Sequence, residues 1–496
     1  MFPGLPRSRS ILIQAPVLAS LLAVPARADY PRDFRSALDG FRGNNFGAVD
    51  KVYLKDASGS GKDRLLALYE LGCFAHLAGD YKKSIGFFNT ADAVAHDYEG
   101  QAVVSAGAAG RTAGAVLLND TVLKYEGQGY EKVMSRTLNA INFLMVGDME
   151  GARVEVRKAE EYQRLERERH QKEVQKAGAR DNARMGDPGV QASYGRMFDF
   201  VKNVRNSFEN AFTYYLSSQI YLAQGEEGLN DAMVEIRKAF ELAPNAPAIR
   251  AAYLEIAAAQ AGEALDRARA DLGLSEQAPL HDPRNTAALV VCYEAGLVPE
   301  LEEVKINLFA VDRNYGVAFP IYRNFEAPQY SVSIALPPPA QPVTTTPVVD
   351  TRTLAVKSLQ ERMPGILARG LAGLVAKVQA QKEAEKKFGV WGGLVASVAS
   401  AIVTEADRRS WLSLPAQVQV AKCNLFPGPN TLTVAGPGWI QPVTLNVDPG
   451  SCTFLIVRAF PGFRRVDFRT VGGTPALPAP EPAEPAPVNP APVPGS

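Results

Sequence analysis

The stretch ARVEVRKAEE, Ala152–Glu161, returns eighty residues later as AMVEIRKAFE, Ala232–Glu241, with seven of ten positions identical. In each copy a small residue, a β-branched residue four positions on and an alanine three further share one face of a helix. Small residues on such a face let a second helix pack closely. These positions are Ala152, Val156 and Ala159 in the first copy and Ala232, Ile236 and Ala239 in the second.

The motif belongs to a helix–turn–helix unit that occurs three times. The first unit lies within residues 63–119 and turns at Ala78–Tyr81, the second contains Thr137–Ala159, and the third runs from Tyr214 to the helix stop at Pro244. The order of small and large residues resembles that of tetratricopeptide repeats. We therefore expect residues 29–272 to form a tetratricopeptide-like helical domain, an α-solenoid.

In such repeats the first helix of each pair lines an inner groove. Here that face carries two residues of the first unit and three of the third. Two interpretations stand: these side chains are core between helices, or together they bind a protein or peptide partner. The predicted groove residues are Tyr69, His76, Phe212, Tyr215 and Gln219.

After residue 284 the pattern changes from helical to extended. Short β-branched and aromatic runs at 284–336 and 411–471 predict the two halves of one antiparallel, sandwich-like β domain. A Pro/Thr-rich linker, 337–350, and a helical hairpin, 351–410, lie between them. Residues 472–496 are rich in proline and alanine and predict a disordered tail. The expected fold class is α+β.

The segment DRRSWLSLP, Asp407–Pro415, follows the predicted hairpin. Arg408 and Arg409 suit the C-terminal end of a helix dipole, and Trp411 and Leu414 are apolar enough to anchor that end on the β domain. We interpret the segment as a structural junction; the alternative is a ligand site.

Four cysteines are too few for a disulfide framework in a chain of 496 residues. Cys73 and Cys292 lie among apolar residues and are predicted to be small, buried hydrophobic side chains. Cys423 and Cys452 lie on predicted strands and are the candidate disulfide pair, which strand geometry decides.

The first 28 residues have the features of a signal peptide. Arg7 and Arg9 precede an apolar run, Ile11–Val24, which ends at Ala26-Arg27-Ala28. The run is too short to span a bilayer. We expect cleavage after Ala28, location in the periplasm or another exported compartment of the bacterial envelope, and no transmembrane span in the mature chain.

Several segments together resemble an uncharacterised bacterial envelope family, often lipoproteins, with tetratricopeptide-like N-terminal halves. They are YEGQGYEKV (125–133), GARVEVRKAEEY (151–162), NTAALVVCYEAGLVP (285–299) and DRRSWLSLP. The resemblance implies an envelope location. This chain lacks the lipidated cysteine of the lipoproteins, and the family offers no catalytic residues to carry over.

Composition and motifs argue against most chemistries. Lys plus Arg and Asp plus Glu number 53 each, which gives no bias toward nucleic acid or acidic membranes. The four histidines lack metal-ligand spacing, the glycine-rich stretch 107–114 lacks the phosphate-loop lysine, and no G-x-S-x-G elbow occurs. We expect no cofactor, no metal and no enzymatic activity.

Two functions remain open. The first is an exported, non-catalytic scaffold that binds a protein or peptide partner in the envelope through its helical repeats. The alternative is a peptidoglycan- or glycan-handling protein, including a hydrolytic one, with its site between the repeats and the β domain. A carboxylate pair for such hydrolysis is selected by geometry and not by sequence.

Overall fold

The computed structural model describes residues 29–108, 123–176, 185–275, 286–310, 313–337, 341–401 and 405–473. The predicted signal peptide, most of the glycine-rich stretch 107–114 and nearly all of the predicted tail lie outside these ranges. None of the described helices is long and apolar enough to cross a membrane.

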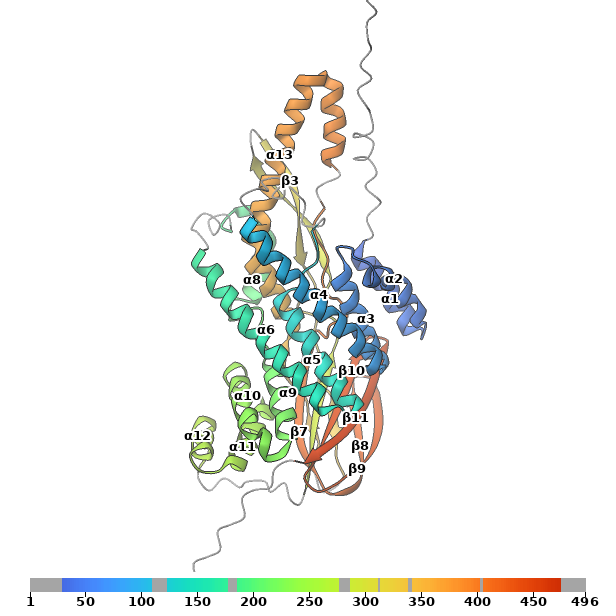
Figure 1. Cartoon of the computed structure of the whole chain (residues 1–496), viewed down its shortest axis with the longest axis vertical. Coiled ribbons are helices and arrows are strands. Elements are labelled where there is room, and N and C mark those ends of the chain that lie inside the picture. Colours follow the sequence, from blue (N-terminus) through green and yellow to red (C-terminus); the bar gives the residue numbers. More distant parts are fainter. Residues whose placement is uncertain are drawn as a thin grey trace, which may run out of the picture.

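Helices make up the N-terminal half of the chain and lie as antiparallel neighbours (Figure 1). They are α1 (Tyr30–Arg42), α2 (Phe46–Ser58), α3 (Arg64–Ala78), α4 (Tyr81–Ala108), α5 (Gly129–Val146), α6 (Met149–Lys176), α8 (Pro188–Phe200), α9 (Ala211–Leu222), α10 (Leu229–Leu242), α11 (Pro247–Gln260) and α12 (Gly262–Leu272). The three predicted units correspond to α3–α4, α5–α6 and α9–α10.

The repeated motif forms the packing face of α6 and α10, as its spacing predicts. The side chains at its three small or β-branched positions are at most 1% exposed in both copies, and those at the equivalent positions of α4 are fully buried. Gly79, Gly147 and Gly225 follow the first helices with φ of +74°, +85° and +80°. Glycine adopts this left-handed conformation without strain, so Gly79 and Gly147 end α3 and α5, while Gly225 lies in the turn that follows α9. The packed positions on α4 are Ser84, Phe88 and Ala91.

The strands form two larger sheets and a separate hairpin. A five-stranded sheet has the order β11-β10-β1-β7-β6, a four-stranded sheet the order β5-β4-β8-β9, and β2 pairs with β3 alone. The strands are β1 (Ala287–Ala295), β2 (Leu301–Ala310), β3 (Arg313–Tyr322), β4 (Ser333–Ala335), β5 (Val343–Thr344), β6 (Thr346–Asp350), β7 (Gln417–Leu425), β8 (Gly428–Gly436), β9 (Trp439–Val447), β10 (Ser451–Phe460) and β11 (Phe463–Gly473).

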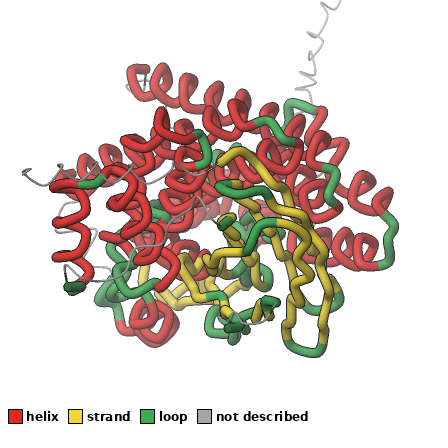
Figure 2. The backbone as a smooth tube through the Cα atoms, turned by 90° about the horizontal axis from the view of Figure 1, so that it is seen from below, coloured by secondary structure: helices red, strands yellow, loops and turns green. Residues whose placement is uncertain are grey.

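The five-stranded sheet lies between the helices and the four-stranded sheet. On central strand β1, Val290 and Cys292 face the helices, whereas Leu289 and Val291 face the other sheet. Every residue of β1 is therefore buried, which explains why its sequence reads as a continuous apolar run. Figure 2 shows the helices as a curved layer around the strands.

The α+β class is confirmed, but the arrangement of the β domain differs from the expected one. β1 pairs with β10 in parallel and with β7 in antiparallel orientation, so the two predicted halves interleave in one sheet. The predicted linker 337–350 contains β5 and β6, which pair with β4 and β7.

The predicted hairpin 351–410 corresponds to one helical element, α13, which runs from Thr351 to Ala401, continues through Pro364 and turns back on itself at its far end (Figure 1). Residues 405–410 are not helical. α13 starts against α5 and α8 and extends beyond the rest of the fold (Figure 1).

Candidate functional site

The inner face of the helices is filled by the chain itself. The five predicted groove residues are all between 0 and 3% exposed, so they do not line an open groove. Two parts of the chain cover them: the five-stranded sheet and residues 405–416, which we call the crossing segment. The buried residues are Tyr69, His76, Phe212, Tyr215 and Gln219. The core interpretation of these side chains is therefore the one that the structure supports.

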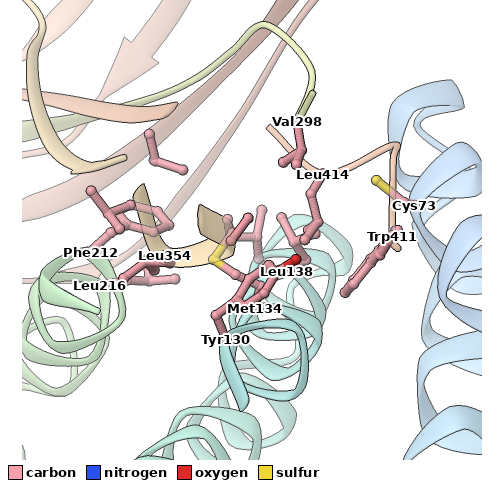
Figure 3. Packing of buried hydrophobic residues seen from close by; sticks show 14 of the residues in the cluster. Cys73, Tyr130, Met134, Leu138, Phe212, Leu216, Val298, Leu354, Trp411 and Leu414 are labelled. Carbon is pink, nitrogen blue, oxygen red and sulfur yellow. The ribbon is translucent and has the colours of Figure 1, made fainter. Parts of the chain in front are cut away.

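The crossing segment packs through Trp411. Its indole is fully buried and stacks on Tyr69, with ring centroids 4.6 Å apart and planes 14° apart, and Phe88 lies at 5.8 Å. Figure 3 shows Trp411 and Leu414 in the core that α5 and α9 also line. The predicted junction at this segment is a packed one.

Two buried carboxylates hold the backbone of the crossing segment. The Trp411 N–H donates to Glu131 Oε1 at 3.0 Å, and the Leu412 N–H donates to Glu70 Oε1 at 2.9 Å. Each carboxylate also accepts a tyrosine hydroxyl, from Tyr125 and Tyr30 respectively. Burial raises the pKa of Glu70 to about 7 and also raises the pKa of Glu131, although these hydrogen bonds act in the opposite direction.

The arginines of the crossing segment do not cap a helix. Arg409 binds Asp407 at 2.7 Å and reaches Asp63, before α3, at 2.6 Å. The guanidinium lowers the pKa of the buried Asp407 carboxyl despite the opposing effect of burial. These ion pairs fasten the crossing segment to the first helical unit, which corrects the expected interaction with a helix dipole.

A polar chain links α3 to the sheet through His76. Its ring nitrogens lie 2.6 Å from Asn142 Oδ1 and 3.1 Å from Glu294 Oε1, and Glu294 lies 3.4 Å from Arg458. Burial opposes protonation of His76, but the Glu294 carboxylate outweighs it and raises the pKa of the imidazole. A histidine, a glutamate and a nearby cysteine would suit catalysis if substrate could reach them. All three are buried, so their role is structural: His76 and Glu294 connect α3 to the five-stranded sheet.

Burial makes the Cys73 thiol equally unreactive. The Cys73 thiol donates to the Ser413 carbonyl at 3.3 Å, and burial raises its pKa to about 12. A thiol in this state is a poor nucleophile.

Cys423 and Cys452 do not form the predicted disulfide; both are free. They lie on β7 and β10, which flank β1 on opposite sides, so two strand spacings, roughly 9–10 Å, separate them. Their side chains also face opposite layers, Cys452 toward the helices and Cys423 toward the other sheet. A disulfide requires Cα atoms within about 7 Å.

The third unit is attached to the sheet in a similar way. Gln219 accepts a hydrogen bond from Lys422 Nζ of β7 at 2.7 Å, and the same ammonium pairs with Glu255 of α11. Tyr215 lies beside Cys292 and Cys452 of the sheet, and its hydroxyl has no hydrogen-bond partner among the described residues.

An open groove of about 360 Å³ lies on the outer side of the helices, between α4, the end of α5 and the start of α6. We call it the outer groove. It combines apolar surface from Phe143 and Val154 with four carboxylates and one ammonium. Its lining consists of Asn89, Asp92, Phe143, Asp148, Glu150, Gly151, Val154, Glu155 and Lys158. Val154, Glu155 and Lys158 of this lining belong to the repeated motif, and Gly151 directly precedes it.

Ion pairs of the second unit form the inner end of the outer groove. Arg136 of α5, 1% exposed, lies 2.9 Å from Glu155 and 3.3 Å from Asp92. Lys158 bridges the same two carboxylates at 3.0 and 3.1 Å. These charges are satisfied within the chain. At the outer end Asp148 Oδ1 accepts from the Gly151 N–H at 2.8 Å, and Glu150 pairs loosely with Arg153 at 3.4 Å.

Sequence reasoning assigned the inner face as the site and did not find the outer groove. The available signal is the repeated motif itself, because Glu155, Arg157 and Lys158 lie mostly outside its packing face. No protein-family model matches the chain, and searches of curated proteins and of solved structures find no significant match.

Proposed function

We propose that this protein is an exported, non-catalytic scaffold that binds a protein or peptide partner in the bacterial envelope through the outer surface of its helical layer. The observation that carries the proposal is the continuous core between helices and sheet, which occupies the inner face, together with the outer groove, which is an open concavity among the described residues. We interpret the helical pairs as tetratricopeptide-like and the two facing sheets as a sandwich. The resemblance to envelope proteins and the signal-peptide pattern support the location.

The absence of an accessible reactive group in the described core supports a role without catalysis. Each buried ionisable cluster on the inner face joins two parts of the chain: Glu70 and Glu131 hold the crossing segment, and His76 joins Glu294. A glycan-handling site between helices and sheet would need open space there. The five predicted groove residues, which lie between the helices and the sheet, are at most 3% exposed.

Affinity capture from envelope extracts tests the scaffold. The mature chain, starting at Asp29, should retain a specific protein after washing, and a Phe143→Ala variant should retain less of it. Saturable binding or cleavage of purified peptidoglycan by the mature chain, with no protein retained, would contradict the proposal. Fractionation and N-terminal sequencing of the full chain test export, with Asp29 as the expected first residue.

A further inference from the structure

The place of the outer groove in the second helical unit has an equivalent in the third unit. Counted from the turn glycines Gly147 and Gly225, Phe143 and Tyr221 occupy the same position on the first helices. On the preceding second helices, Asn89 directly follows the packing residue of α4, and Arg157 directly follows that of α6. The same two positions therefore carry Phe143 and Asn89 around the outer groove and Tyr221 and Arg157 at the equivalent place of the third unit.

In the third unit an arginine of the chain itself lies at this place. Arg157 of α6 is exposed and lies close enough to the buried Tyr221 of α9 to lower the pKa of its phenol, although burial is the larger effect and leaves that pKa raised. In the second unit the short Asn89 turns inward and accepts a hydrogen bond from Asn139 at 3.0 Å. The space beside Phe143 stays open as the outer groove.

The charges around the outer groove suit a cation. Its lining carries four carboxylates and one ammonium. Even when Arg136 and Arg153, which pair with these carboxylates, are counted as well, four acidic groups face three basic ones. Asp148 and Glu150 are the exposed acids, and the Glu150 side chain is 67% exposed.

An arginine fits this combination better than a lysine. A guanidinium is planar, stacks on an aromatic ring and can donate to two carboxylates together, whereas an ammonium is a strongly hydrated point charge. Gly151 contributes to the shape, because a side chain at this position would collide with the Phe143 ring. The ring therefore lies close to the backbone of α6, where it lines the groove.

We propose that the outer groove takes an arginine side chain from the partner, with the guanidinium against Phe143 and facing Asp148 and Glu150. The arginine would occupy the place equivalent to that of Arg157 one unit further on. This inference rests on the proposed scaffold function and names the chemistry of the partner.

Peptide binding to the mature chain tests the inference directly. The probes are a fluorescent Gly-Leu-Arg-Leu-Gly amide and its lysine and citrulline counterparts, compared by fluorescence anisotropy at low salt. The arginine peptide should bind at least roughly tenfold more tightly than the neutral, nearly isosteric citrulline peptide, because the charge-assisted hydrogen bonds are lost. Equal binding of the two, or no binding of the arginine peptide at millimolar concentration, would overturn the inference.

Variants locate the binding. Asn89→Arg should fill the groove from within, and Asp148→Asn with Glu150→Gln should remove its outer charges; each should weaken the arginine peptide roughly tenfold or more. The matched control, Glu226→Gln with Glu227→Gln, neutralises two exposed carboxylates at the equivalent turn of the third unit and should leave binding unchanged. Thermal unfolding verifies that each variant is folded. Unchanged binding in the first two variants contradicts the assignment.

The same variants separate this inference from the scaffold proposal. If Asn89→Arg abolishes peptide binding but the variant still captures its envelope partner, the scaffold stands and the groove is not the partner site. If the peptide binds as expected but no partner is captured, the arginine chemistry holds and the scaffold function fails.

Discussion

Glu155 and Glu235 occupy the same position in the two copies of the motif, yet their buried carboxylates have different neighbours. Glu155 is paired with Arg136 of α5. In the third unit the position equivalent to Arg136 is Tyr214 of α9. Glu235 keeps Lys238 at 2.7 Å, but its Oε2 has no partner among the described residues. Burial raises the pKa of Glu235 to about 7, despite Lys238.

This contrast predicts that replacing glutamate by glutamine has a large effect on stability at position 155 and a small or stabilising effect at position 235. Glu155→Gln should destabilise the protein by about 2 kcal/mol, because Arg136 loses a charged partner in the core. Glu235→Gln should cost less than about 0.5 kcal/mol at pH 8, or stabilise, since an ionised group with an unsatisfied oxygen is removed. Urea unfolding of both variants checks the pair. A similar loss in both would show that Tyr214 and Arg136 are equivalent neighbours.

The raised pKa values also predict how stability depends on pH. Glu70 and Glu235 have a folded pKa of about 7, above their ordinary 4.5, so folding favours their protonated forms. Their contribution is complete below about pH 4.5 and is lost as the pH rises through 7. The free energy of unfolding should therefore fall between pH 5.5 and pH 8.5.

Denaturant unfolding at these two pH values measures the effect. The double variant Glu70→Gln and Glu235→Gln should flatten the pH dependence, because glutamine keeps an acceptor oxygen without titrating. A steeper fall in the variant than in the original chain would contradict the assignment.

Among the elements, the crossing segment joins the most parts of the fold. Trp411→Ala should destabilise by about 3–5 kcal/mol, because it leaves a cavity between Tyr69 and Phe88 in a closely packed core. Ile440→Ala is the control: this side chain is 69% exposed on β9 and should change stability by less than about 0.5 kcal/mol. Equal losses, measured by urea unfolding, would show that the crossing segment does not anchor the core.

Strand β11 explains a feature of the helical turns that sequence could not. Its Arg465 and Arg469 side chains lie against Gly79 and Gly147, where a Cβ would collide with each guanidinium. The positive φ requires glycine at both turns, whereas the flexible guanidinium ends could move aside; the turns thus contact a strand more than 300 residues later. The edge of the sheet lies across successive turns of the helical layer.

Sequence periodicity predicted the helical units, their packing faces and most strands, because these depend on residues close together in the chain. It did not predict which strands pair. The apolar run of β1 is compatible with any buried position, and its parallel pairing with β10 links Ala288 to Cys452. The inner face was misread for the same reason: Tyr215 and Gln219 look like groove residues until Lys422 and the sheet are placed on them.

The ion pairs along the second helices suggest how the array of units ends. Lys158 of α6 reaches Asp92 of α4, and Lys238 of α10 reaches Glu160 of α6, at equivalent positions. On α10 the position equivalent to Asp92 and Glu160 is 240. Phe240 occupies it and packs on Tyr253 of α11, with ring centroids 5.3 Å apart. An aromatic contact thus replaces the ion pair where the repetition stops.

For the whole molecule, the shared core predicts that the helical half is not stable alone. A fragment covering residues 29–275 would expose Tyr69, Phe212 and Tyr215, which the sheet and the crossing segment bury in the full chain. It should aggregate or lack a cooperative thermal transition, whereas the mature chain should unfold in one transition. Circular dichroism and light scattering distinguish the outcomes; a monomeric fragment with a sharp transition would contradict the prediction.

The position of β1 has a consequence for the order of events during synthesis. β1 is complete at Ala295, but its neighbours β7 and β10 end at Leu425 and Phe460. A chain emerging from the ribosome therefore carries an unpaired apolar strand for more than a hundred further residues. Contacts this distant in sequence slow folding, because a long loop must close before they form. The late arrival of its partners keeps the central strand of the larger sheet without both of its neighbours until 165 residues beyond its own end have been synthesised.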